Sequence, residues 1–552
     1  MMKMRLWILL AAGAAALAVG YGAFMHYRIG LPGMINRMRD PILATQPVAW
    51  DQGPATADTA AGERQPNIIV ILVDDLGIND ISTFGGGVAG GLLQTPNIDA
   101  LAARGAIFTN GYAGNATCAP SRAAIMTGRF ATRFGFEFTP APMPFHRLLG
   151  SFDFGPHPAI YHTDREADSI PLDEQGLPTS EITMAELLRD QGYRTLFFGK
   201  WHLGGAEEFQ PQNQGFDEWL GFMPGAALFM DINDPNVVNA VADFDPIDRF
   251  LWPNLSFAVR HNGGQRFHPD RYMTDYLTEH AVSAIEANAN RPFFMYFALN
   301  APHTPLQALR SDYDALAQIE DERLRVYAAM IRAADRAVGE IVASLEEQGI
   351  ADNTLIVFSS DNGGASYVGF PDINAPYRGW KATFFEGGIR VPMFVSWPAR
   401  IAAGSIVDSP AAHVDIFATA AAAAGAPIPQ DRAMDGIDMI ELIDAAGTAP
   451  PERDLFWRSD RYRVLLRDGW KLQISELPPR TWLFNLEDDP TEQFNLASSE
   501  PDRLAAMTSA LNAIDAVQAG PIWPSLVAPP VYIDHNILEP RSVDDEYIHW
   551  AN

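Results

Sequence analysis

The segment TCAPSRAAIMTGR, residues 117–129, contains Cys118, the only cysteine in a chain of 552 residues. A single cysteine cannot form a disulfide within the chain. Pro120, a residue that favours turns, and Arg122, a charged residue, follow this cysteine closely in the sequence. Such neighbours are unusual for a cysteine that only fills a hydrophobic core. Cys118 is therefore a candidate for a chemical role.

Two groups of oxygen ligands follow strongly apolar runs. Asp74 and Asp75 come directly after NIIVILV, and Asp361 and Asn362 come directly after TLIVFSS. Ligands bind outside the carboxyl ends of parallel strands, and adjacent carboxylates repel each other unless a cation neutralises them. An isolated Asp-Asp pair is more often a helix cap or a solvated turn. Two such groups without a zinc-type pattern of Cys or His favour one hard cation, calcium or magnesium.

Three further segments carry a cation or an imidazole. GKWHLG contains Lys200 and His202, NAPHTP contains His303 between two prolines, and GWKATFFEGG contains Lys381. Lysine offers a point charge to an anion, and an imidazole can donate or accept a proton near neutral pH. An exposed loop, a solvated lysine or a histidine packed at a loop corner explains each segment in isolation. Only their combination favours a shared site.

The elements that would position these residues alternate along the chain. Apolar, β-branched runs cover residues 67–73, 193–199, 292–299, 354–360 and 391–397, with helical patterns at 95–105, 183–192 and 321–347. Strands covered on both faces read as continuous apolar runs, and the alternation with helices favours a parallel sheet. We therefore predict an α/β fold with a large mixed, mostly parallel sheet flanked by helices over residues 66–430.

The character of the sequence changes after residue 430. The short aromatic runs DLFWRS, YRVLLRDGWKLQIS and TWLFNLE predict a small antiparallel sheet, and residues 501–518 predict a helix. We expect residues 431–552 to form a smaller C-terminal α+β domain with a tail. Residues 205–270 are rich in Asn, Asp, Pro and Phe with little periodicity, and we expect a surface insertion there.

Net charge and the N-terminal segment restrict the partners and the compartment. The formal net charge of −29 disfavours both nucleic acid and anionic lipid as partners. Residues 1–28 combine a basic start with an uncharged apolar run, 7–25, which is long enough to span a bilayer as a helix. A cleavable signal peptide explains the same pattern, but we favour an uncleaved anchor. Either indicates an exported protein, in bacteria a periplasmic one, and an uncleaved anchor at residues 7–25 would attach it to the inner membrane. Residues 29–65 are expected to be a linker.

Taken together, the motifs resemble those of the type I sulfatases, the formylglycine-dependent members of the alkaline phosphatase superfamily. The resemblance rests on C-x-P-S-R followed by TGR, with NIIVILVDDLG upstream and GKWHLG, APHTP, DNGG and GWK…EGG downstream, in the order of the family. It extends from residue 66 to the DDPTEQFNL segment at 488–496. It implies an alkaline-phosphatase-like fold and arylsulfatase-type hydrolysis of sulfate monoesters by S–O cleavage.

The resemblance implies a modification and a metal ion. A maturation enzyme that reads Pro120 and Arg122 would oxidise Cys118 to formylglycine, also called 3-oxoalanine. The hydrated aldehyde would attack sulfur and later expel sulfate, so that one difficult step is split into two easier ones. One calcium ion per chain would be held by an oxygen of modified Cys118 and by the side chains of Asp74, Asp75, Asp361 and Asn362.

The resemblance also implies roles for the cations and imidazoles. Arg122, Lys200 and Lys381 would provide positive charge for the sulfate and for the transition state. His303 with Lys381 would bind sulfate and protonate the leaving oxygen. His202 would assist the release of sulfate.

Two other functions stay open at this point. A phosphonate monoester or phosphodiester hydrolase of the same superfamily can also use formylglycine. A non-catalytic surface protein that binds sulfated glycans would keep the cysteine unmodified. We expect the substrate to be a small-molecule or glycan sulfate ester, because export and an acidic surface suit a periplasmic scavenger of sulfated glycans.

Overall fold

The computed structural model describes residues 30–57, 59, 64–447 and 452–552. The membrane anchor or signal peptide expected at 1–28 lies outside these residues and stays a prediction. Within the described residues, no helix is both long and apolar enough to cross a membrane.

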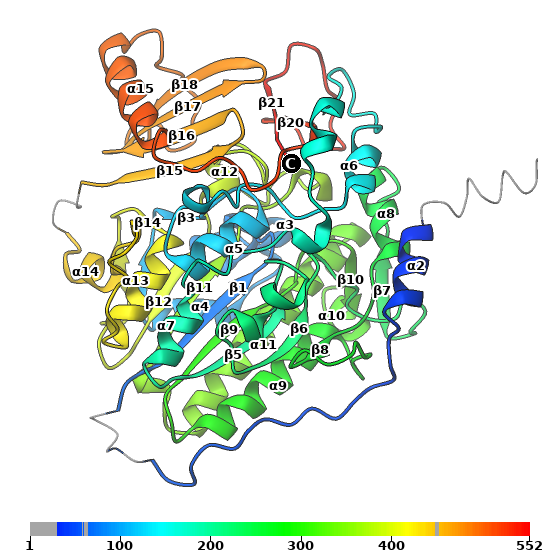
Figure 1. The fold of residues 1–552 in the computed structure, drawn as a ribbon, viewed down its shortest axis with the longest axis vertical. Coiled ribbons are helices and arrows are strands. Elements are labelled where there is room, and N and C mark those ends of the chain that lie inside the picture. The colour runs from blue at the N-terminus through cyan, green and yellow to red at the C-terminus, as the bar shows by residue number, and fades with distance from the viewer. Residues whose placement is uncertain (1–29, 58, 60–63, 448–451) are drawn as a thin grey trace, which may run out of the picture.

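A nine-stranded sheet forms the centre of the protein (Figure 1). In spatial order its strands are β13 (Ser405–Val407), β2 (Ala106–Phe108), β12 (Met393–Ser396), β11 (Thr354–Ser360), β1 (Asn67–Val73), β9 (Phe293–Ala298), β5 (Arg194–Lys200), β6 (Glu218–Phe222) and β8 (Arg260–His261). The strands from β11 to β6 are parallel throughout, and β12 and β8 add antiparallel neighbours on the two sides. This arrangement confirms the predicted fold class.

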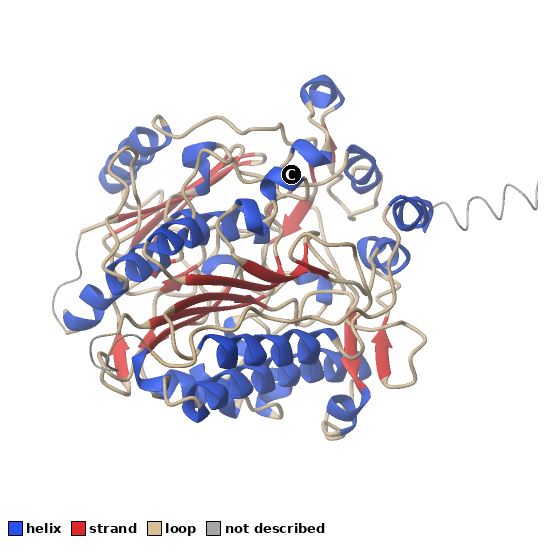
Figure 2. Ribbon diagram, turned by 60° about the horizontal axis from the view of Figure 1, so that its bottom comes forward, coloured by secondary structure: helices blue, strands red, loops and turns tan. Residues whose placement is uncertain are grey.

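Helices cover both faces of this sheet (Figure 2). On β1, Ile69 and Ile71 belong to one apolar core, and Val70 and Leu72 belong to the core on the opposite face. Successive side chains of a strand point to opposite faces, so a strand buried on both sides is apolar at every position. The first core includes residues of α4 (Pro96–Ala103), α9 (Met273–Asn288) and α11 (Glu322–Glu347), and the second includes residues of α5 (Cys118–Thr127), α7 (Met184–Asp190) and α13 (Val414–Ala423).

Two regions differ from the sequence-based expectation. The expected surface insertion at 205–270 contains β6, which is buried along its whole length inside the sheet. The sequence of β6, EWLGF, is short and contains a glycine, so it has no clear apolar period. The expected linker at 29–65 contains the helix α2 (Leu31–Arg39), and its Trp50 is buried against Phe198.

A four-stranded antiparallel sheet follows in the C-terminal region, as expected. Its strands are β15 (Asp454–Ser459), β16 (Tyr462–Arg467), β17 (Trp470–Glu476) and β18 (Pro479–Asn485), and α15 (Pro501–Asp515) contacts β16 and β17. Buried Lys471 on β17 binds Glu386 Oε1 at 2.7 Å and Glu492 Oε1 at 3.0 Å. Glu386 begins the short helix α12 (Glu386–Ile389), so a buried charge network fixes this sheet to the chain segment beyond Lys381. The domain boundary at residue 430 stays a prediction.

A buried carboxylic acid connects the loop after β1 to α11. Asp80 Oδ2 accepts hydrogen bonds from the Gly77 backbone N–H at 2.8 Å and from the Tyr327 hydroxyl at 2.6 Å. Burial raises the pKa of Asp80 to about 8, although both hydrogen bonds act to lower it. The folded protein therefore keeps Asp80 protonated at neutral pH, because the low-dielectric surroundings disfavour the charged form.

Replacing Asp80 with Asn should remove a pH-dependent part of the stability. The pKa of Asp80 is about 8 in the folded protein against 3.8 for the ordinary side chain. Between these values the unfolded chain releases a proton that the folded protein retains, so this group lowers the free energy of unfolding as the pH rises. Denaturant unfolding should therefore show Asp80→Asn gaining stability relative to the wild type between about pH 5 and about pH 8. A difference that does not change with pH would contradict the raised pKa.

Candidate active site

The carboxyl ends of β1 and β11 bring the two predicted groups of oxygen ligands together. The strands are parallel and in register, with Val73 opposite Ser360. Asp74 and Asp75 follow β1, Asp361 and Asn362 follow β11, and all four side chains are buried. The Asp75 backbone N–H donates to Asp361 Oδ1 at 3.2 Å. These four residues therefore lie together at one edge of the sheet.

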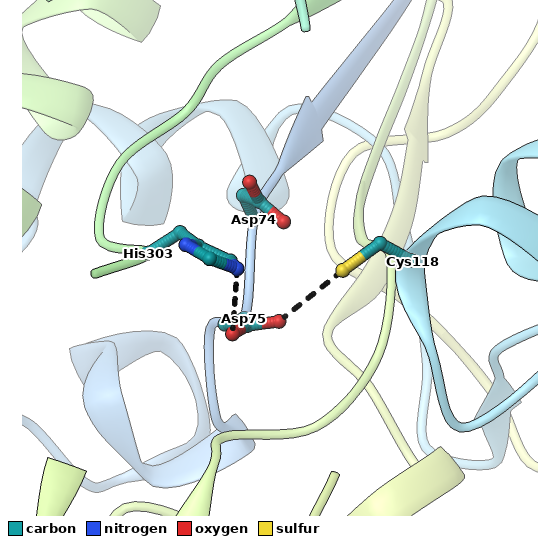
Figure 3. Close-up of side chains that lie close together, drawn as sticks. All are labelled: Asp74, Asp75, Cys118 and His303. Atoms are coloured by element: carbon teal, nitrogen blue, oxygen red, sulfur yellow. Dashed lines mark hydrogen bonds and ion pairs between the residues drawn. The ribbon is translucent and has the colours of Figure 1, made fainter. Parts of the chain in front are cut away.

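Cys118 lies beside this group as the first residue of α5 (Figure 3). Its Sγ is 3.7 Å from Asp75 Oδ1 and 3.2 Å from Lys381 Nζ. Burial, and next the charge of Asp361, raise the pKa of the Cys118 thiol. Because the thiolate is the nucleophilic form, an unmodified Cys118 in this environment is a weak nucleophile.

Three buried carboxylates of the site each form an ion pair with a predicted cation. Lys200 Nζ lies 2.7 and 2.8 Å from the carboxylate oxygens of Asp74. Lys381 Nζ lies at the same two distances from those of Asp75. Buried charges are stable only when they are paired and hydrogen-bonded. The lysines and the carboxylates are therefore direct partners, which their separation in the sequence does not indicate.

Arg122 forms the third pair, and each of its three guanidinium nitrogens donates a hydrogen bond within the protein. Its Nε and Nη2 donate to Asp361 Oδ2 at 3.0 and 2.8 Å, and its Nη1 donates to the Lys200 carbonyl at 2.9 Å. The side chain is fully buried. Arg122 thus orients Asp361, and the direct contact with sulfate expected for it stays a prediction.

His303 directs one ring nitrogen at the carboxylates. Its Nδ1 donates to the Thr304 carbonyl at 2.6 Å, and its Nε2 lies 3.6 Å from Asp75 Oδ2 (Figure 3). Burial lowers the pKa of His303 to about 3, so the imidazole is neutral. Since Nδ1 carries the proton that binds the carbonyl, Nε2 is the nitrogen available to exchange a proton with a ligand.

His202 lies beside the site and makes no side-chain hydrogen bond or ion pair with the other candidates within the described part of the chain. It adopts a left-handed backbone conformation, with φ of 60°. Its Nδ1 is buried and has no hydrogen-bond partner in the part of the chain that the structure describes. The ring lies against Gly225, where an added Cβ would be 2.5 Å from Nε2. Burial and then the charges of Lys200 and Arg122 hold the pKa of His202 well below its usual value.

Four side chains of the site lie close enough together to hold a metal ion. Ligand atoms of Asp74, Asp75, Cys118 and His303 all lie within 4.8 Å of one another. Asn362 Nδ2 donates to Asp75 Oδ1 at 2.8 Å, whereas its buried Oδ1 has no hydrogen-bond partner among the described residues. A buried acceptor without a partner is costly unless a ligand satisfies it. His303 belongs to this group of side chains, although the sequence analysis assigned it only to acid–base chemistry.

Comparisons with known proteins agree with this geometry. A family model described as Sulfatase matches residues 66–426. The chain belongs to the sulfatase family. N-acetylgalactosamine-6-sulfatase of Mus musculus is 34% identical over 393 residues, covering 70% of this chain and 67% of that protein. Steryl-sulfatase of Homo sapiens is 30% identical over 504 residues, covering 79% and 78%. The crystal structure of Ps i-CgsB in complex with k-i-k-neocarrahexaose has a TM-score of 0.69 at 30% identity and covers 83% of this chain and 95% of that one.

Membership of the sulfatase family confirms the predicted enzyme class, a sulfuric ester hydrolase. The candidate site lies within the part of the chain that the family model matches, residues 66–426. This part includes the buried carboxylates, the lysines and Cys118.

Sequence reasoning missed Tyr367 in this sulfatase. Its hydroxyl donates to Asp75 Oδ2 at 2.7 Å and lies 3.2 Å from Lys381 Nζ. Tyr367 follows the DNGG motif in a three-residue 3-10 helix, Ser366–Val368, which is too short to show a periodicity, so only the folded chain places it beside Asp75. It helps to fix the carboxylate and the lysine in one orientation.

His413 was also missed, and it connects the helix that carries Cys118 to the central sheet. Its Nδ1 lies 2.9 Å from Ser121 Oγ on α5, and its Nε2 lies 3.0 Å from Ser359 Oγ on β11. Burial lowers its pKa to about 3, so the bridging imidazole is neutral. No local pattern in the sequence marks this histidine, since its two partners are distant along the chain.

Replacing His413 with Ala should reduce turnover without touching a reacting group. The change removes the bridge that sets α5 relative to β11, and small displacements of reacting groups cost about 10- to 100-fold in rate. We expect a loss of that size in kcat for a sulfate ester in steady-state assays. His280→Ala is the matched control, because that half-buried imidazole packs on Tyr276 away from the site. Equal losses in both variants would contradict a positioning role for His413.

Proposed function

We propose that this sulfatase hydrolyses sulfate monoesters at a formylglycine made from Cys118, with one calcium ion held by Asp74, Asp75, Asp361 and Asn362. The observation that carries the proposal is the position of Cys118: its side chain lies at the start of a buried helix, in contact with both Asp75 and Lys381. A thiol with a raised pKa is poorly suited to act there itself, whereas a helix start suits an anion.

The modified residue would supply a hydrated aldehyde oxygen as nucleophile, and the calcium ion would supply positive charge. The protein supplies the remaining chemistry. Arg122 and Tyr367 hold Asp361 and Asp75 in place through direct hydrogen bonds. The three cations balance the three buried carboxylates, so a bound divalent cation leaves the site with net positive charge, which favours an anionic ester.

Lys381 and His303 are our candidates for the leaving-group side of the ester. Lys381 Nζ is within 3.2 Å of Cys118 Sγ, so it can also contact an oxygen of a sulfate placed at that residue. His303 presents Nε2 towards the same carboxylate that Lys381 binds. In the neutral ring this nitrogen carries no proton, so His303 would first take up a proton from solvent at Nε2 and then transfer it to the departing alcohol. We assign His202 to sulfate release, as the resemblance implies.

The alcohol part of the substrate would occupy a cavity of about 500 Å³ that Lys381 and Tyr367 line. Its walls include the aromatic rings of Phe154 and Tyr532, and Arg541 stacks over Tyr532 at 4.6 Å. Apolar walls with a few polar groups are typical of sites for small ligands. We propose a sulfated carbohydrate as substrate, supported by the carbohydrate named with the similar Ps i-CgsB structure.

Paired aryl sulfate and aryl phosphate esters test the proposed reaction. We expect kcat/KM to favour the sulfate ester, and we expect Cys118→Ala to lose on the order of 10⁴-fold or more while it keeps its fold. Far-ultraviolet circular dichroism and thermal unfolding check the fold of the variant. A higher kcat/KM for the phosphate ester, or substantial turnover by Cys118→Ala, would contradict the proposal.

Removal of the Asn362 amide oxygen tests the proposed calcium site by a readout other than activity. Calorimetric titration of calcium into chelator-treated protein should show binding that weakens at least about 10- to 100-fold in Asn362→Ala. Calcium should also raise the melting temperature of the wild type more than that of the variant, because a ligand that binds only the folded state stabilises it. Asn374→Ala is the matched control, since this buried amide bonds only to backbone groups of Gly364 and Gly379. Equal calcium affinity in Asn362→Ala and the wild type would refute the assignment.

A further inference from the structure

The helix α2 presents an apolar face that points away from the protein. Leu31, Met34, Ile35 and Met38 follow the i, i+3, i+4, i+7 pattern of one helix face. They are 39%, 50%, 39% and 76% exposed, respectively. The opposite side of α2 is fixed to the protein, because the Gly33 N–H donates to Asn254 Oδ1 at 2.6 Å at the end of α8 (Pro246–Asn254). The exposed apolar face is therefore held in a fixed orientation.

An apolar groove continues this face across the protein surface. The groove encloses about 970 Å³ between α2, α8 and α6 (Met143–Leu149), which lie together at one side of the molecule (Figure 1). Leu31 and Ile35 form its α2 side, and Phe145, Phe152 and Phe250 line the remainder. Contiguous exposed apolar surface of this kind marks an interaction site.

Three arginines lie on α2 or in the groove, although the protein as a whole is strongly acidic. Arg37 and Arg39 lie in the last turn of α2, and Arg249 lines the groove. Among the residues that the structure describes, none of the three forms an ion pair with a carboxylate. The whole chain carries a formal charge of −29, so this local cluster is an exception that favours an anionic partner.

The position of α2 in the sequence indicates which kind of partner this surface binds. The uncharged apolar run 7–25 ends shortly before α2, which begins at Leu31. If that run enters a bilayer, α2 lies within a few residues of the membrane surface. An amphipathic helix with large apolar side chains and arginines is the type that lies in the interface of a bilayer.

We propose that α2 and the adjoining groove dock on an anionic lipid bilayer. Leu31, Met34, Ile35 and Met38 enter the boundary between headgroups and acyl chains, and Arg39 and Arg249, which line the groove, bind lipid phosphates. Arg37 donates to the Pro253 carbonyl at 3.2 Å and joins α2 to α8. Pro246 lines both the groove and the cavity beside Lys381, so docking places the catalytic cavity next to the membrane surface. This surface is separate from the residues proposed for sulfate hydrolysis.

A fluorescent probe on the full-length chain tests the docking. Met38→Cys carries an environment-sensitive label, and Val517→Cys, at an exposed position beyond α15, carries the same label as the control. Buried Cys118 is protected from labelling, which mass spectrometry verifies. In vesicles of phosphatidylcholine and phosphatidylglycerol, we expect blue-shifted emission from residue 38 and quenching by lipids brominated about 5–10 Å below the headgroups. We expect neither effect at residue 517.

The same probe separates docking from simple anchoring by the N-terminal run. Anchoring alone would leave both probes in a polar environment, and this result would overturn the proposal. Blue-shifted emission from residue 38 without quenching by brominated lipid would mean that the chain itself or a second copy covers the face, which also overturns it. Arg39→Gln and Arg249→Gln should each lower the ratio of docked to undocked protein about fivefold in anionic vesicles but not in pure phosphatidylcholine. None of these measurements depends on sulfate ester hydrolysis, so their interpretation stays the same if the proposed function is wrong.

Discussion

Two parallel strands, β1 and β11, end side by side and bring three carboxylates into a region without solvent. Each carboxylate is balanced by one buried cation from a distant part of the chain. Removing one partner of such a pair costs about 3–5 kcal/mol, because the other charge is then left unpaired. The six side chains therefore form one coupled unit, and every other feature of the site is arranged around it.

Other side chains hold these six residues in a fixed position relative to Cys118. His413 connects α5 to β11, and Tyr367 binds the same carboxylate as Lys381. Beyond Lys381, the buried pair of Glu386 and Lys471 fixes the C-terminal sheet to the catalytic region. The residues of the candidate site are thus held by packed elements on several sides, which is the condition for a site that acts by preorganised charge.

Much of the fold and the positions of the ligand groups could be predicted, because they depend on local sequence. Strands buried on both faces are continuous apolar runs, so β1 and β11 were predicted with their observed bounds. β6 was missed because its five residues lack a period. The pairing of Lys200 with Asp74 and the roles of Tyr367 and His413 depend on contacts between residues far apart in the chain. No local pattern carries that information, and only the folded sheet brings these side chains together.

The central claim is that the residue at position 118 acts as an aldehyde and not as a thiol. Mass spectrometry of the tryptic peptide 105–122 from the exported protein tests this claim directly. The account predicts a peptide that has lost one sulfur and two hydrogens and gained one oxygen relative to the cysteine form, in proportion to the specific activity of each preparation. A fully active preparation whose peptide retains the unmodified cysteine would contradict it.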